Sequence, residues 1–184
     1  MFPRPDFFEG SLLNFAENLL YPAGCKIDES SPAIIAATEG TRETVTWFQL
    51  RERVRQCAAS MRSMGINESD RVAGFLANHT NTVVAMLAAT SIGAIWTGVS
   101  PDTGVHAVLD RLVQIEPVIL FADNAVTYNG KVHDGHEKIK EIAKELKELQ
   151  ALVIFDTVPG HKINLPDFEV GKGKVMTYHE FLTS

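Results

Sequence analysis

Residues 71–100 read RVAGFLANHTNTVVAMLAATSIGAIWTGVS, and this stretch decides the fold. It opens with a short apolar run at residues 71–76, which is typical of a buried strand. Asn81 then provides a helix-capping side chain, and Gly93 ends the helix that follows. Residues 94–99 form a second, nearly continuous apolar run of the kind found in parallel sheets. Strand, helix and strand in this order predict a βαβ unit.

The same order repeats farther along the chain. An amphipathic segment ends at Pro117, and a third apolar run follows at residues 118–122. A second amphipathic segment at residues 136–150 precedes a fourth apolar run at residues 151–155. Four strands that alternate with three helices predict an α/β fold with a mainly parallel sheet flanked by helices.

Two segments nearer the N-terminus add a pair of strands and a long helix. The apolar run at residues 32–37 predicts a strand, and residues 43–45 predict a second one. Thr46 and Gln49 form a capping-box pattern, and the apolar period behind them predicts an amphipathic helix that ends at Gly65.

The two ends of the chain show no sustained period. Residues 1–31 are predicted to form an irregular segment that wraps another surface, and residues 159–174 a surface loop. Thr177 and Glu180 repeat the capping-box signal for a helix from Tyr178, but the chain ends scarcely one turn later. We therefore expect one incomplete domain over residues 1–184, with an α/β body over 32–156 and a loop with a truncated helix start over 157–184.

Composition and charge exclude several classes of partner. Seventeen basic and twenty-three acidic residues give a formal net charge of −6 without a dense basic cluster, so nucleic acid is not expected. Cys25 and Cys57 form no C-x-x-C pair, so we expect neither a disulfide nor a zinc site. The start of the chain has no secretory signal, and no apolar run approaches the ~20 residues that cross a bilayer. We expect no membrane span and a cytoplasmic location.

A parallel sheet places ligands at the carboxyl ends of its strands. The site is therefore expected in the loops that follow Leu76, Val99 and Ala122. The first of these loops lacks the glycines of a dinucleotide-binding turn. Residues 97–104 lead from a strand end to a helix start, where free amides favour an anion. Asp102 or Thr103 can cap that helix, and we favour an ordinary cap over a ligand loop.

Four other features could suggest a ligand or catalytic site, but we favour a structural role for each. The Gly-Lys-Gly-Lys segment at residues 171–174 lacks the remaining residues of a phosphate loop, so we favour a solvated loop. The His and acidic residues at 133–137 match no familiar zinc spacing, and we favour solvated surface. We interpret His79 as a turn or capping residue rather than a base, and Cys57 as a core residue rather than a nucleophile.

Several motifs together resemble the adenylate-forming enzymes. TWFQL at residues 46–50 is similar to the T-[YW]-x-x-L opening of their first long helix, and AMLA at residues 85–88 with GA at residues 93–94 is similar to another early motif. Further stretches resemble the acetoacetyl-CoA synthetase branch: LLNFAEN at 12–18, SPDTGV at 100–105, LDR at 109–111 and YNGK at 128–131. The resemblance covers nearly the whole chain.

The resemblance implies a fragment of an acetoacetate:CoA ligase, an acid–thiol ligase. Such enzymes use ATP and Mg²⁺ to join a carboxylate to AMP, and the thiol of coenzyme A then attacks the acyl adenylate. The family's phosphate-binding loop, adenine motif, ribose-binding Asp and catalytic Lys are not found in residues 1–184. We therefore assign no catalytic residue and no metal ligand, and we expect the fragment alone to be inactive and to bind no cofactor tightly.

The expected partners also follow from this resemblance. They are acetoacetate, ATP and CoA in the whole enzyme, together with the rest of its N-terminal domain and its C-terminal domain. In related acetyl-CoA synthetases, basic residues in the region that matches 128–131 contact the phosphates of CoA, which makes Lys131 the ligand candidate here. The alternative for Lys131 is an exposed loop lysine without a ligand.

Two alternatives remain for the whole chain. One is a non-catalytic α/β module that binds a partner, and the other is a fragment of another short-chain acyl-CoA synthetase, such as acetyl-CoA synthetase.

Overall fold

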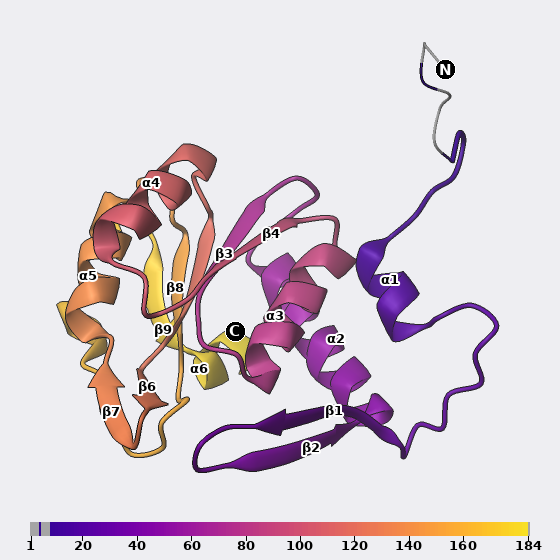
Figure 1. Cartoon of the computed structure of the whole chain (residues 1–184). Helices are drawn as coiled ribbons and strands as arrows, with labels where there is room; N and C mark the ends of the chain where they lie inside the picture. The colour runs from indigo at the N-terminus through magenta and orange to yellow at the C-terminus, as the bar shows by residue number, and fades with distance from the viewer. Residues whose placement is uncertain (1–3, 5–7, 184) are drawn as a thin grey trace.

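A five-stranded parallel sheet forms the centre of the molecule (Figure 1). The structure is a computed structural model that describes residue 4 and residues 8–183. Every neighbouring pair in the sheet runs parallel, in the order β4-β3-β5-β8-β9. The strands are β3 (Arg71–Phe75), β4 (Ile95–Val99), β5 (Ile119–Asp123), β8 (Ala151–Phe155) and β9 (Lys174–Thr177). The predicted α/β class and parallel strands are confirmed, and β9 is an additional strand that we did not predict.

Helices cover both faces of this sheet (Figure 1). The first face carries α2 (Trp47–Ser63), α3 (Thr80–Ser91) and α6 (Tyr178–Thr183), and the second carries α4 (Val105–Ile115) and α5 (His136–Glu145). Successive strand residues point to opposite faces, so Phe121 packs in the first layer and Leu120 in the second. Because both faces are covered, β5 and β8 are buried along their whole length.

The long helix α2 begins at the predicted capping box. Gln49 N donates to Thr46 Oγ1 at 3.3 Å, and Thr46 N donates to Gln49 Oε1 at 3.0 Å. Gly65, just beyond the helix, has a φ of 83°, which only glycine adopts without strain. The same type of capping box, made by Thr177 and Glu180, starts α6 at the predicted residue.

Two antiparallel hairpins lie beside the sheet (Figure 1). β1 (Pro32–Ala37) and β2 (Arg42–Thr46) are the two strands predicted there, and they pair with each other; β6 (Ala125–Tyr128) pairs with β7 (Lys131–Asp134). The second hairpin is predicted only as a loop around Asn129 and Gly130. These two residues have φ values of 51° and 68°, the left-handed conformation that a two-residue hairpin turn requires and that Asn-Gly adopts readily.

Short helical segments lie where the sequence predicts irregular structure. α1 (Phe15–Leu20) is capped by Asn14, whose Oδ1 accepts from Glu17 N at 2.9 Å and whose Nδ2 donates to Thr90 O at 2.9 Å. A 3₁₀ turn, η1 (Leu165–Asp167), lies within the predicted loop. Helices this short contain too few residues to show a period. Predictions on residues 1–3, 5–7 and 184 lie outside the described residues.

The described residues also bear on membrane insertion. Within them, no helix combines the length and the apolar character that crossing a bilayer requires.

Candidate ligand-binding site

The carboxyl ends of β3, β5 and β8 meet around a buried carboxylate, that of Asp123, which is 3% exposed. It accepts hydrogen bonds from Ala77 N and His79 Nε2, both at 2.8 Å, and from Thr157 Oγ1. A buried carboxylate must be hydrogen-bonded, and these donors come from the loops that follow β3 and β8. Asp123 therefore holds the two loops in place at this edge of the sheet.

His79 connects this carboxylate to the start of α3. Its Nδ1 accepts from Thr82 N at 3.3 Å and its Nε2 contacts Asp123, so one neutral tautomer with the proton on Nε2 satisfies both contacts. The predicted capping role of His79 is confirmed, whereas the predicted cap Asn81 lies inside the helix. Both ring nitrogens are engaged in fixed contacts, which favours structural duty over service as a base.

The neighbouring Asn124 fixes the loop after β8 in a similar way. Its Nδ2 lies 2.9–3.0 Å from Asp156 Oδ1, Val158 O and His161 O, and its Oδ1 accepts from Ala125 N at 2.8 Å. Neither Asp123 nor Asn124 was predicted as a site residue from the sequence. The available signal was an Asp-Asn pair directly after a fully apolar run, where a buried polar pair needs partners.

Among the hollows along this edge of the described structure, three are lined in part by Asn78, which is exposed. The largest has a volume of about 300 Å³ and lies beside Trp96 and Ser100, at the end of β4. The second, of about 250 Å³, lies between α3 and β1. The third, of about 210 Å³, lies between the turn of the β1–β2 hairpin and β6. The edge expected to bind a ligand is thus hollowed by cavities rather than filled.

The β6–β7 hairpin places Lys131 beside this edge. Lys131 is the first residue of β7 and is exposed. The preceding turn is held by Glu39 from the β1–β2 hairpin, whose carboxylate accepts from Asn129 N at 2.6 Å and Gly130 N at 2.7 Å. The Gly130 amide, and next the Asn129 amide, lower the pKa of Glu39 below its usual value. Lys131 forms no ion pair with any described residue, so its ammonium group is available.

Comparison with known proteins places the chain in a family. Residues 26–177 match the family model described as AMP-binding enzyme. The chain belongs to the AMP-binding enzyme family.

Proteins named as acyl-CoA synthetases are similar to this AMP-binding chain in sequence and in structure. It is 52% identical over 99% of its length to malonamoyl-CoA synthetase vrtB of Penicillium aethiopicum, and 46% identical over 88% to acetoacetyl-CoA synthetase of Mus musculus. The structure matches acetoacetyl-CoA synthetase from Streptomyces lividans with a TM-score of 0.78 and 35% identity over 94% of the chain. The chain spans about a quarter of the length of these proteins: 25%, 24% and 25%.

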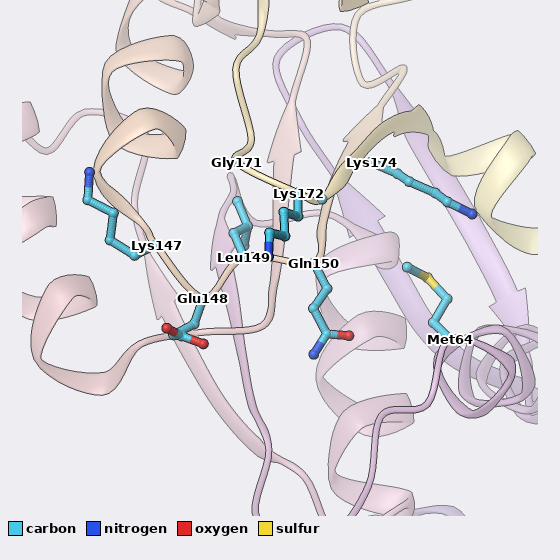
Figure 2. Close-up of a pocket in the computed structure, with 9 residues that line it drawn as sticks. Met64, Lys147, Glu148, Leu149, Gln150, Gly171, Lys172 and Lys174 are labelled. Carbon is cyan, nitrogen blue, oxygen red and sulfur yellow. The ribbon is translucent and has the colours of Figure 1, made fainter.

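Another cavity of the AMP-binding chain lies at the opposite edge of the sheet (Figure 2). It has a volume of about 680 Å³ and is lined by Met64, residues 147–150 and residues 171–174. In Figure 2 the Lys147 and Lys174 side chains point to opposite sides. The Gly-Lys-Gly-Lys segment leads into β9, whose first residue is Lys174, whereas a phosphate loop follows a strand. Its exposed Gly171 and Lys172 fit the predicted solvated loop.

The predicted cap at Asp102 or Thr103 is wrong. α4 begins at Val105 and its N-cap is Gly104, which makes no side-chain hydrogen bond. Residues 101–103 form a turn instead, in which Thr103 N donates to Ser100 O at 3.1 Å.

The cluster at residues 133–137 divides between two separate contacts rather than forming one site. His161 Nε2 lies 3.2 Å from Asp134 Oδ2, and His136 Nε2 lies 3.3 Å from Asp167 Oδ2. The prediction of solvated surface is wrong for His136, because its side chain is only 16% exposed and packs on Phe168. In the part of the chain that the structure describes, no group of three or more His, Cys, Asp or Glu residues could hold a metal ion.

Cys57 is a core residue, as predicted. It is 0% exposed, and burial raises the pKa of its thiol to about 12, against an opposing hydrogen bond with Tyr178. A thiol in this state is not a nucleophile near neutral pH.

Proposed function

We propose that the chain is part of an ATP-dependent acetoacetate:CoA ligase, which forms an acyl adenylate and then a thioester. The observation that carries this proposal is the similarity to acetoacetyl-CoA synthetases of mouse and Streptomyces lividans over most of the chain. Under this proposal the partners are acetoacetate, ATP and CoA, together with the remaining domains of the ligase. We propose three segments within the chain: an irregular wrapping segment at 1–31, an α/β body at 32–156, and a loop with a truncated helix start at 157–184. The proposed compartment is the cytoplasm, where the free thiols of Cys25 and Cys57 would stay reduced.

The acyl groups named in the relatives, malonamoyl and acetoacetyl, limit the range of substrates that we propose. Acetoacetate and malonamate both carry a carbonyl group at the third carbon and differ in a terminal methyl or amino group. Acetate lacks that carbonyl. The proposed substrate class is therefore a short carboxylate with a carbonyl group at this position, and among such acids we favour acetoacetate because several relatives carry its name.

The described residues fit the two nucleotide-containing ligands differently. At the carboxyl edge, the Asp123 carboxylate is turned inward and the loop after β3 presents Asn78 rather than a cation. This arrangement does not fit ATP with Mg²⁺, so no step is assigned to these residues. The exposed, unpaired ammonium group of Lys131 does fit a phosphate of CoA, to which it would act as a point charge.

A chimera tests the ligase proposal. The chain replaces the matching quarter of mouse acetoacetyl-CoA synthetase, and pyrophosphate release is measured with acetoacetate, malonamate and acetate. We expect release with acetoacetate from the chimera and none from the chain alone. A folded chimera that is inactive would favour the non-catalytic partner-binding module, and preference for acetate would favour acetyl-CoA synthetase. Turnover by the chain alone would contradict the proposed inactivity.

An NMR titration of the chain with CoA tests the proposed contact between Lys131 and a CoA phosphate. We expect millimolar binding that shifts the amide signals of residues 129–131. K131Q should weaken this binding by up to about fivefold, because an exposed charge pair contributes at most about 1 kcal/mol. K147Q, at the opposite edge of the sheet, is the matched control and should leave the affinity unchanged. Equal affinities of K131Q and the wild type would remove the proposed contact.

A further inference from the structure

Glu39 joins two hairpins that are far apart in the sequence. Its carboxylate accepts from the consecutive amides of Asn129 and Gly130 at 2.6 and 2.7 Å, across 90 and 91 positions of the chain. Both partners are backbone groups, so the contact defines the position of the turn rather than that of a side chain. Charge-assisted hydrogen bonds of this type are the stronger ones.

The turn that carries Glu39 is itself well defined. Thr38 N donates to Thr41 O at 2.9 Å, Thr41 N donates to Thr38 Oγ1 at 3.2 Å, and the two hydroxyl groups lie 2.7 Å apart. These bonds close the turn of the β1–β2 hairpin on both sides of Glu39. The carboxylate is therefore presented from a fixed turn.

The contact borders the cavity of about 210 Å³. Thr38, Gly40 and Thr41 line it from one hairpin, and Val126 and Thr127 line it from the other. Glu39 links these two walls at their tips, so it sets how far apart they stand.

Lys131 follows the clamped turn directly and makes no ion pair with Glu39. The carboxylate is occupied by the two amides, which leaves the ammonium group free for an anion. We propose that Glu39 is a positioning residue for Lys131: it fixes the β6–β7 turn so that Lys131 meets a phosphate of CoA. This inference rests on the CoA contact proposed above.

Two possible effects of Glu39 have opposite signs. A fixed turn strengthens phosphate binding at Lys131, whereas an uncompensated carboxylate nearby weakens it through repulsion. Removal of the side chain therefore distinguishes the two roles. The E39Q variant would keep one acceptor oxygen and lose the charge, so it separates the turn contact from the charge.

The experiment is an NMR titration of the E39A, E39Q, K131Q and E39A/K131Q chains with CoA. E148Q, which changes an exposed carboxylate at the opposite edge, is the control and should behave as wild type. We expect E39A to weaken CoA binding about threefold to fivefold and E39Q to lie between E39A and wild type. In the K131Q background, E39A should have no further effect. The amides of Asn129 and Gly130 should exchange about tenfold faster in E39A than in wild type.

Each other result overturns a defined part of the inference. Stronger CoA binding in both E39A and E39Q would show that Glu39 acts by repulsion. Unchanged binding in E39A, with binding that still depends on Lys131, would remove the role of Glu39 and leave the CoA contact intact. Equal CoA affinities of K131Q and the wild-type chain would remove both the Lys131 contact and the positioning role of Glu39. Unchanged exchange of the two amides would show that Glu39 does not hold the turn.

Discussion

Asp123 shows how one residue can organise an edge of a parallel sheet. Its carboxylate is buried, and its three hydrogen-bond donors belong to loops that follow two other strands. Such a group stabilises the fold only while all of its partners are present, because an unpaired buried donor or acceptor is costly. The cavities that border Asn78 therefore depend on a residue that barely contacts solvent.

Replacement of Asp123 tests this dependence. D123A leaves the donors from Ala77, His79 and Thr157 without their acceptor, and we expect a loss of about 3 kcal/mol or more in the free energy of unfolding. D123N keeps the shape and one acceptor oxygen, so it should lose less. Urea denaturation measures both, with D102N at an exposed turn of the same edge as the control. A D123A chain as stable as wild type would contradict the organising role.

The contact between buried Cys57 and half-buried Tyr178 predicts a loss of stability in alkali. Burial raises the pKa of Cys57 from 9.0 to about 12 and raises the pKa of Tyr178 well above its usual value. Well below about pH 9 both groups are neutral in the folded and the unfolded chain, so their contribution is complete there. Above about pH 9 for Cys57, and above about pH 10 for Tyr178, the unfolded chain releases a proton that the folded chain retains, so the free energy of unfolding falls by about 1.4 kcal/mol per pH unit for each group.

Urea denaturation between pH 8 and pH 11 measures this slope. C57A should reduce it, whereas C25A, which removes an exposed thiol, should leave it unchanged. A slope that is the same in C57A and wild type would show that the Cys57 thiol does not contribute.

At the scale of elements, β9 shows how a strand depends on a close backbone approach. A Cβ atom added at Gly173 would lie 2.5 Å from Leu149 O and 2.9 Å from the carbonyl carbon of Gln150. Gly173 therefore lets the chain pass close to the start of β8 immediately before it pairs as β9. Close packing against β8 therefore explains the glycine at position 173, which in the sequence resembles part of a phosphate loop.

We accordingly expect G173A to cost about 1–3 kcal/mol, because the backbone must move to admit the methyl group. Hydrogen exchange of the β9 amides should increase more than that of β3, which lies farther from the change. G40A is the control, since nothing lies within 4 Å of a Cβ atom at that position. Equal exchange in G173A and wild type would contradict the packing argument.

The elements that could be predicted from the sequence are those with a long pattern. The alternation of apolar runs and helical periods predicts the four strands β3, β4, β5 and β8, and Thr46 with Gln49 marks the start of α2. β9 is short and its burial is uneven, so it has no comparable signal. The cap of α3 is His79 rather than Asn81, because a contact with Asp123 fixes the His79 ring. For the site, the sequence predicts the carboxyl edge of the sheet as its place and Lys131 as a ligand candidate, and both stay predictions. The Glu39 contact could not be predicted, since it joins residues 90 positions apart.

At the scale of the whole molecule, the N-terminal part leaves large apolar side chains in solvent. Leu12 is 99% exposed, Leu13 is 70% exposed and Phe15 is 57% exposed. Adjacent exposed apolar residues favour association. These side chains therefore form an apolar surface through which copies of the chain can associate.

We expect the isolated chain to associate reversibly through this surface. The double variant L12S/L13S should lower the apparent mass in sedimentation velocity at high concentration, without a change in the free energy of unfolding. V113S, which removes a half-exposed apolar side chain from α4, is the control. A wild-type chain that stays monomeric at every concentration would contradict this expectation.

The order of strands has a consequence for biosynthesis. Of the strands in the parallel sheet, β3 and β4 are made first and pair with each other. β5 then joins on the free side of β3, and β8 and β9 follow in chain order. After β4 is paired, each further strand is therefore added to the same edge of the sheet, the one away from β4. On the ribosome, each emerging strand would find its neighbour already exposed, and no insertion between paired strands is needed. Assembly can thus keep pace with translation, which shortens the time during which an unpaired β8 could meet another nascent chain.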